Sequence, residues 1–405
     1  MELDVHWAGQ HPARIGRLHQ DAGGTVFFEY DRLWRAGAME LSPIYLPNST
    51  QGSVSTPTPS YGGLHGLFQD ALPDWWGERL MQRHFEAKGI PWQRVTALRK
   101  LACQGSRKMG ALAFLPTLDE ADFNDALVVE IGVLVEAARE TIRGETGSVL
   151  KALLRSGMSP GGAQPKALLA FSADFSAISM AEPAPPGFAP WLVKFDIDPG
   201  FPVGRIEAAY ADMARAAGIA MPPTRLLEAA RGAHFMVRRF DRDADGHRLH
   251  LHSFSGLTHT PLRDGLDYGD LMDLARNLTK NHAAVVELYR RAVFNVIAAN
   301  DDDHGRNHAF LMNETGQWSL PPAFDVTLAS YPLATGFRAA RIHGRAAGIT
   351  RRDLLALGNS QGIDKPAEII AQVIAAVASW PTHAATYDIP PWVTTAVAAE
   401  HRAGI

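Results

Sequence analysis

The chain contains a single cysteine among its 405 residues, so no disulfide can form within it. We therefore predict a reducing environment, and hence a cytoplasmic protein. No segment approaches the roughly 18 consecutive apolar residues that a membrane span requires. The start of the chain, Met1 to Trp7, lacks the basic and apolar regions of a signal peptide. A net charge of -4 argues against a broad nucleic-acid-binding surface, which would normally be basic.

What the chain does contain is typical of a globular protein, with 46% hydrophobic and 20% charged residues. Its length allows two or three domains with a substantial core. Apolar residues at helical spacing predict helices at 74–88, 126–155, 206–217, 270–279, 282–299 and 365–380. Shorter β-prone segments predict strands at 24–30, 110–116, 166–171, 191–195 and 234–240.

The order of these segments indicates the fold class. Strands dominate the front of the chain, strands and a helix share the middle, and helices dominate from about residue 268 onward. This order predicts an α+β fold. We detect no internal repeats. The histidine run that comprises His247, His250 and His252 is predicted to be a strand with one solvated face.

Residues 300–307, with the sequence Asn-Asp-Asp-Asp-His-Gly-Arg-Asn, follow a predicted core helix and carry the strongest functional signal. Asp302 and Asn307 are five positions apart, and Asp325 follows further along the chain. In a phosphoryl-transfer site, one aspartate orients the attacking hydroxyl, while an asparagine and a second aspartate hold Mg²⁺. Counting back five positions from Asn307 selects Asp302 rather than either neighbouring aspartate. The alternative interpretation of this segment is a solvated acidic turn.

Three upstream features would suit a bound nucleotide. The glycine loop 159–166, Ser-Pro-Gly-Gly-Ala-Gln-Pro-Lys, allows backbone N–H groups to approach an anion, although a plain Gly-Gly turn is the alternative. Lys194 interrupts an apolar strand, where an unpaired ammonium is costly unless it reaches solvent. Glu207, near the start of the next predicted helix, is its natural partner, as in the lysine–glutamate pair of kinases. Residues 235–240 lie where a hinge strand would contact adenine.

In this order, the motifs resemble those of the HipA family, the serine/threonine-kinase toxins of bacterial type II toxin–antitoxin modules. The resemblance covers nearly the whole chain and rests on segments 27–31, 41–43, 68–74, 110–114, 159–166, 302–307 and 324–325. It implies a two-lobed, protein-kinase-like fold with a β-rich N-terminal subdomain and an all-helical C-terminal lobe. The implied division is an N-terminal subdomain at 1–118, a kinase N-lobe-like region with phosphate loop and hinge at 119–243, and a C-lobe with the catalytic and metal motifs at 244–405.

The resemblance also implies a role for each matching residue. Asp302 would be the catalytic aspartate, with Asn307 and Asp325 beside it as Mg²⁺ ligands. Ser159 would be the serine that the enzyme autophosphorylates to inactivate itself. The other matching residues would bind ATP: Gly161, Gly162, Ala163, Gln164, Pro165, Lys166, Lys194, Glu207, Arg238, Phe240, His304, Arg306 and Phe324.

The predicted activity is therefore that of an ATP- and Mg²⁺-dependent serine/threonine protein kinase. By resemblance, the substrate would be a cytoplasmic protein, such as glutamyl-tRNA synthetase or another aminoacyl-tRNA synthetase. The partner would be a small helix-turn-helix antitoxin, through which the protein would reach DNA. Residues 251–257 differ from the polar segment expected after the hinge, which leaves the substrate open.

Two alternative functions remain at this stage. One is a catalytically weak, nucleotide-binding co-repressor that acts with a helix-turn-helix antitoxin. The other is a metal-dependent phosphoesterase, whose ligands would be residues 301–304, His308 and Asp325, with the three histidines of the 247–252 run.

Overall fold

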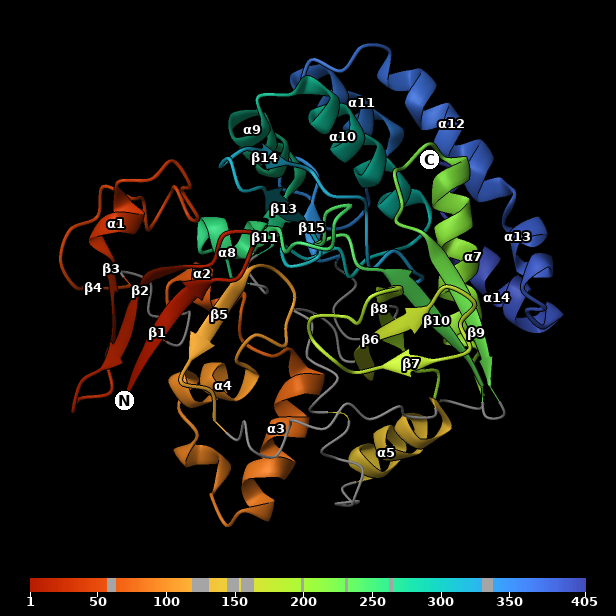
Figure 1. Cartoon of the computed structure of the whole chain (residues 1–405). Coiled ribbons are helices and arrows are strands. Elements are labelled where there is room, and N and C mark those ends of the chain that lie inside the picture. The colour runs from red at the N-terminus through yellow and green to blue at the C-terminus, as the bar shows by residue number, and fades with distance from the viewer. Residues whose placement is uncertain are drawn as a thin grey trace.

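The computed structural model describes residues 1–56, 63–118, 131–143, 153, 164–197, 200–229, 232–261, 265–329 and 338–405. Figure 1 shows a β-rich region at the N-terminal side, a sheet in the middle, and a group of helices that ends the chain. No described helix combines the length and the apolarity that are needed to cross a lipid bilayer.

The first region is built on an antiparallel sheet with the strand order β4-β3-β2-β1-β5. In β1 every second side chain is buried, namely Leu3, Val5 and Trp7, because one face of the strand packs on the core. Helix α3 begins after its N-cap Asp74 and buries its apolar stripe. The elements are β1 (Glu2–Trp7), β2 (Ala13–Gln20), β3 (Val26–Tyr30), α1 (Arg32–Arg35), β4 (Val54–Ser55), α2 (Gly66–Gln69), α3 (Trp75–Ala87), the 3₁₀ turn η2 (Trp92–Arg94), α4 (Ala97–Gln104) and β5 (Leu112–Leu115).

The central sheet has the strand order β7-β6-β8-β10-β9, with antiparallel pairing throughout. Lys166 of β6 lies opposite Lys194 of β8 in this register. Helix α7 approaches β10 so closely that a Cβ atom on Gly204 would lie 2.0 Å from the carbonyl oxygen of Ala233. Glycine at this position therefore brings the buried Glu207 against the sheet. The elements are α5 (Ile131–Arg143), β6 (Lys166–Ser172), β7 (Ile178–Ser179), β8 (Phe188–Lys194), α7 (Val203–Ala216), β9 (Thr224–Ala229) and β10 (Gly232–Arg238).

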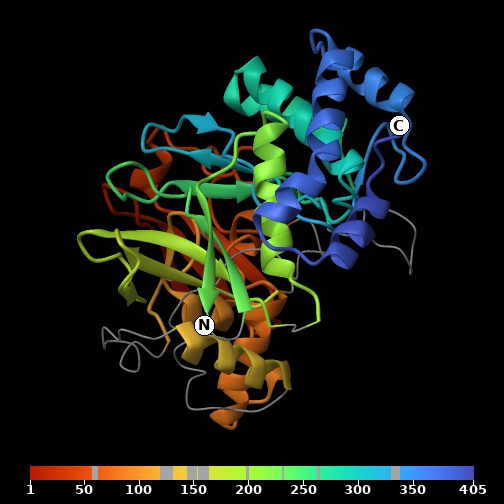
Figure 2. The ribbon, with the colours of Figure 1, turned by 90° about the vertical axis from the view of Figure 1, so that its right-hand side faces the viewer.

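The remaining region is mainly helical, as expected, but it is not all-helical. It also contains strands of two to four residues, which are too short to give a periodic sequence signal. In Figure 2, α7 stands between these helices and the central sheet. The elements are β11 (His250–Ser253), α8 (Phe254–Thr258), β12 (Leu266–Asp267), α9 (Tyr268–Thr279), α10 (His282–Ile297), β13 (Ala309–Met312), β14 (Trp318–Ser319), β15 (Ala340–Arg341), α11 (Arg351–Ser360), α12 (Pro366–Ala378), α13 (Trp380–Thr386) and α14 (Pro391–Glu400).

Most of the predicted elements are confirmed, including α3, α7, α9, α10 and three strands of the central sheet, β6, β8 and β10; β7 and β9 were not predicted. The helix predicted at 365–380 is divided, because α12 ends at Ala378 and α13 begins at Trp380. Of the helix predicted at 126–155, residues 131–143 form α5, and most of the rest lies outside the described residues.

The hydrophobic cores join parts of the chain that lie far apart in sequence. Trp76 and Leu80 of α3 share one core with Val193 of the central sheet. Helices α2 and α8 touch at Gly66, where a Cβ atom would lie 1.9 Å from the carbonyl oxygen of Gly256. This packing runs across both boundaries of the predicted domain division. The division itself stays a prediction.

Candidate active site

The loop that follows α10 is held through two of its three consecutive aspartates. The carboxylate of Asp301 accepts two hydrogen bonds from the guanidinium of Arg402, one of them 2.7 Å long. The carboxylate of Asp303 accepts a hydrogen bond of 2.7 Å from the hydroxyl of Tyr268 and another from Arg338. Both aspartates therefore fix the loop to the helical lobe.

Asp302, between them, has the most exposed side chain, at 37% against 7% and 1% for its neighbours. Its Oδ1 lies 4.0 Å from Nε2 of His304. Asp302 also lines a cavity together with Asn307 and Asp325. The middle aspartate thus lines this cavity while its neighbours hold arginines, and the catalytic role assigned to it by counting back from Asn307 stays a prediction.

The contribution of the Asp301 contact can be measured. We expect Arg402→Ala to lower the free energy of unfolding by about 2 kcal/mol, because it leaves a mostly buried carboxylate without its charged hydrogen-bond donor. Urea denaturation of the variant and the wild type measures this difference. The control is Arg352→Ala, which removes an exposed arginine of α11. Equal stability of R402A and the wild type would show that Arg402 does not hold the loop.

Asn307 and Asp325 line the same cavity. The amide Nδ2 of Asn307 donates a hydrogen bond of 2.9 Å to the carbonyl oxygen of Asp302, so the amide oxygen is the atom available to a cation. Asp325 has a φ of 57°, a left-handed conformation that is unusual for a residue with a side chain and that is found preferentially at functional sites. A carboxylate and an amide oxygen are the ligands that a hard cation such as Mg²⁺ takes.

Lys194 connects the central sheet to the C-terminal lobe through two ion pairs. Its ammonium contacts the carboxylates of Glu207 and Asp325. Burial alone would lower the pKa of Lys194, but Asp325 and Glu207 together raise it above its ordinary value. Burial alone would likewise raise the pKa of Asp325, but Lys194 and Lys166 lower it to about 2. Lys194 and Asp325 are therefore charged at neutral pH, and the lysine–glutamate pair expected from sequence is present.

Lys166 pairs with a residue that the sequence analysis missed. Its Nζ lies 2.9 Å from Oδ2 of Asp74, and both side chains are buried. The other carboxylate oxygen of Asp74 accepts a hydrogen bond of 2.7 Å from the backbone N–H of Gly77. The one sequence feature that could have indicated a role for Asp74 in the site is its place at the end of the 68–74 motif. An N-cap role accounts for an aspartate there without reference to a site, so that signal was not decisive.

Lys166, Lys194, Glu207, Asn307 and Asp325 line one cleft, which encloses about 1010 Å³ of space that is partly open to solvent. The rings of Phe240 and Phe324 stack within its lining, with their centroids 5.2 Å apart. Lys194 and Asp325 also line a second cavity that contains Asp302. The predicted residues that line the cleft are Lys166, Lys194, Glu207, Arg238, Phe240, Arg306, Asn307, Phe324 and Asp325.

Not every predicted residue lies in this lining. Gln164, two residues before β6, lines the second cavity. Pro165 and His304 line neither cavity, and the carbonyl oxygen of Pro165 instead accepts a hydrogen bond of 2.8 Å from the N–H of Phe195. The other glycine-loop calls fall outside the described residues: Ser159, Gly161, Gly162 and Ala163.

The prediction of a solvated histidine face is wrong. His250 and His252 of β11 are 1% and 0% exposed, because the N-terminal region covers them. His252 Nδ1 lies 2.6 Å from Oδ2 of Asp70, and its Nε2 lies 3.2 Å from the hydroxyl of Ser42. His250 Nε2 lies 3.0 Å from the carbonyl oxygen of Leu41. Alternation in a strand predicts two faces, but not which distant element covers each of them.

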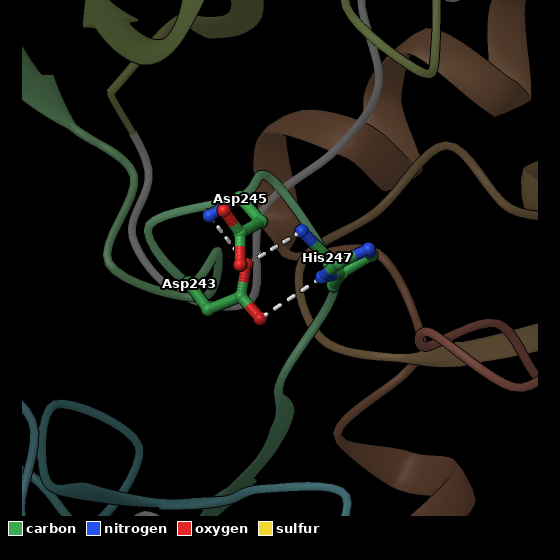
Figure 3. Close-up of side chains that lie close together, drawn as sticks. All are labelled: Asp243, Asp245 and His247. Carbon is green, nitrogen blue, oxygen red and sulfur yellow. Dashed lines mark hydrogen bonds and ion pairs between the residues drawn. The ribbon is translucent and has the colours of Figure 1, made fainter.

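Within the described residues, one group has the spacing of metal ligands, namely Asp243, Asp245 and His247 (Figure 3). Its geometry is that of a tight turn, because one carboxylate oxygen of Asp243 accepts backbone hydrogen bonds of 3.0 Å from Asp245 and 2.8 Å from His247. No described group of this kind includes His308 or Asp325, as the phosphoesterase alternative would require.

Comparison with known proteins finds two family matches, and the second runs across the predicted boundary between residues 243 and 244. Residues 3–115 match the HipA N-terminal domain, and residues 158–380 match the HipA-like C-terminal domain. A protein of Sinorhizobium fredii named "Putative kinase Y4mE" is 28% identical over 369 residues, which cover 85% of this chain and 81% of that protein. A protein of Haemophilus influenzae named "Putative kinase" is 27% identical over 109 residues, which cover 24% of this chain and 32% of that protein.

A solved structure shows the fold. HipA of Shewanella oneidensis MR-1, in a complex with HipB and operator DNA, superposes with a TM-score of 0.69 at 19% sequence identity. The superposition covers 98% of this chain and 96% of that one. The α+β fold expected from the sequence is therefore confirmed as a HipA-like fold. Since the C-terminal domain match alone spans more than half of the chain, the protein belongs to the HipA family.

Proposed function

We propose that the protein is an ATP- and Mg²⁺-dependent serine/threonine protein kinase of the HipA type. The observation that carries this proposal is the contact of Lys194 with both Glu207 and Asp325, beside a cavity that also holds Asp302 and Asn307. This is the set of groups that a phosphoryl-transfer site requires. The names of the two relatives, which describe kinases, support the same activity.

The two lysines near Asp325 are already paired, which argues for a divalent cation. Lys166 contacts Asp74, and Lys194 contacts Glu207 and Asp325, so neither ammonium offers an uncompensated positive charge to a triphosphate. A Mg²⁺ ion held by Asn307 and Asp325 would neutralise the phosphate oxygens and polarise the γ-phosphoryl group. We therefore expect that ATP binds this protein weakly when divalent cations are removed.

Asp302 is placed to act on the acceptor. Asp302 lines the cavity that Lys166 and Asp325 also line, on a loop fixed on both sides by ion pairs. In the proposed reaction it orients a serine or threonine hydroxyl of a protein and accepts the hydroxyl proton as the γ-phosphoryl group moves in line. The rigid loop keeps the distance between this base and the phosphate end of the cleft constant.

The test is transfer of labelled γ-phosphate from ATP. The purified protein is incubated with a cell lysate and labelled ATP, with Mg²⁺ in one sample and excess EDTA in the other. We expect Mg²⁺-dependent labelling of the protein itself and of at least one lysate protein. ATP binding without any transfer would favour the co-repressor alternative instead.

A partner and a substrate class follow from the family. Because the Shewanella relative was solved with HipB and operator DNA, we propose that this protein also binds a small helix-turn-helix antitoxin and reaches DNA through it. We further propose a cytoplasmic protein substrate, with an aminoacyl-tRNA synthetase as the first candidate. Phosphoproteomics after brief expression, with an Asp302→Ala variant as the control, would identify the phosphorylated protein.

Autophosphorylation of Ser159 gives a separate prediction. A phosphate there adds a charge of about -1.5 to -2 beside residues proposed to hold a polyphosphate. We expect the Ser159-phosphorylated form to bind ATP on the order of tenfold more weakly than the Ser159→Ala form. Mass spectrometry identifies the modified form, and calorimetry compares the two affinities. Equal affinities would rule out self-inactivation by this route.

A further inference from the structure

Lys108 is a buried lysine that the proposed mechanism does not use. It lies between α4 and β5 in the N-terminal region, is 5% exposed, and lines the cleft. Its ammonium donates one hydrogen bond, 3.3 Å long, to the carbonyl oxygen of Met109. Lys166 and Lys194 each contact a carboxylate, whereas no described carboxylate lies within ion-pair distance of Lys108. The ammonium also lies 5.6 Å from the centroid of the Phe114 ring. A buried ammonium with one hydrogen-bond acceptor for three donors is costly unless a ligand supplies more.

The acids nearest to Lys108 are engaged by other groups. Asp241 accepts hydrogen bonds from Arg239 and Arg242 and from the backbone N–H of Gly110. Asp70 accepts hydrogen bonds from the backbone and hydroxyl of Ser253 and contacts a histidine. The charged and titratable groups around the ammonium are Asp70, Asp241, Arg242, Arg248 and His250. Burial, and then Arg248, lower the pKa of Lys108 to about 7.

The Lys108 segment is joined to the hinge. The guanidinium of Arg239, immediately after β10, donates a hydrogen bond of 3.1 Å to the carbonyl oxygen of Lys108. The N–H of Gly110 donates one of 2.7 Å to Asp241 on the same stretch. The phosphate end of the cleft is marked instead by Lys166 and Lys194, which also line the cavity that holds Asp302. Lys108 does not line that cavity, so it belongs to the hinge side of the cleft.

We propose that Lys108 is a nucleotide-binding residue, and that its ammonium donates a hydrogen bond to an acceptor atom on the base or sugar of the bound nucleotide. The N-terminal domain is then one wall of the nucleotide site, rather than a separate module beside the kinase lobes. This inference rests on the proposed function, since it takes the bound ligand to be ATP.

The test compares two ligands that share a triphosphate and differ in the nucleoside. Calorimetry measures the Kd of ATP and of inorganic tripolyphosphate, both with Mg²⁺, for the wild type, Lys108→Met and Lys108→Gln. The matched control is Lys100→Met, because Lys100 belongs to the same region, pairs with Glu78 and lies outside the cleft lining. A thermal melt of each variant establishes that it is folded, and Lys108→Gln serves if Lys108→Met does not fold.

We expect Lys108→Met to weaken ATP binding by about tenfold, the loss of one hydrogen bond from the Lys108 amino group. Tripolyphosphate binding should stay within about twofold of the wild type, and Lys100→Met should leave both ligands unaffected. Unchanged ATP affinity in the folded variant would overturn the inference while leaving the proposed function intact. An equal loss for both ligands would overturn the assignment to the nucleoside. Failure of the folded wild type to bind ATP would overturn the proposed function, and this inference with it.

Discussion

Asp302→Asn is expected to slow γ-phosphoryl transfer by a factor on the order of 10²–10⁴, the usual contribution of a positioned general base. Asparagine keeps the size and shape of the side chain but cannot accept the proton of the attacking hydroxyl. The loop should keep its conformation, because its fixed contacts are made by Asp301 and Asp303. The rate of labelled phosphate transfer measures the loss, and calorimetry should find the affinity for ATP within a few-fold of the wild type.

The control for this variant is Asp364→Asn, which makes the same change at an exposed position before α12. It should leave the transfer rate unaltered. If Asp302→Asn retained the wild-type rate within a factor of two, the role assigned to Asp302 would be wrong. If Asp302→Asn instead lost ATP binding together with the transfer rate, the carboxylate would act in nucleotide binding rather than on the acceptor hydroxyl.

The charged loop at residues 300–307 and the lysine–glutamate pair could be singled out from sequence for a physical reason. In both cases the chemistry needs charged side chains at positions that local structure alone would disfavour. Lys194 interrupts an apolar strand, and the aspartates follow a buried helix, so each demands a partner of opposite charge. Such a conflict between local preference and residue type is visible in one sequence, without knowledge of the fold.

The contributions of the N-terminal region could not be predicted in this way. Asp74 and Lys166 are 92 positions apart, and Arg239 and Lys108 are 131 positions apart. Nothing in the local pattern of either segment shows that they meet, because their contact depends on how α3 and the segment before β5 pack against the central sheet. The solvated histidine face and the all-helical lobe were wrong for the same reason, since both depend on pairing between distant segments.

Contacts with distant arginines also explain how three adjacent aspartates can be accommodated. A run of three carboxylates would repel itself if all three faced one cavity. Asp301 is neutralised by Arg402, and Asp303 by Arg338, so the two outer acids lie in cationic surroundings. Asp302 alone of the three lines the cavity with Asp325. The sequence shows the run but not the arginines, which lie well beyond it in the chain.

Asp325→Asn is expected to reduce Mg²⁺-dependent ATP turnover by about 10³-fold or more, which corresponds to about 4 kcal/mol of transition-state stabilisation. The variant removes the charge that faces both Lys194 and the proposed cation. Asparagine is the informative replacement, because it tolerates the left-handed backbone conformation that Asp325 adopts. Asp325→Ala should lose turnover as well, with an added penalty from backbone strain.

Turnover is measured against Mg²⁺ concentration, and the folded state of each variant is followed by its thermal melt. Lys194 keeps its ion pair with Glu207 in the variant, so we expect Asp325→Asn to remain folded. Because the pKa of Asp325 is about 2, the wild-type carboxylate is charged throughout the pH range from 5 to 9, and its contact with Lys194 is lost only as the pH falls from about 4 toward 2. Any change in wild-type turnover between pH 5 and 9 must then arise from another group. Wild-type Mg²⁺ dependence in folded Asp325→Asn would place the cation elsewhere in the cleft.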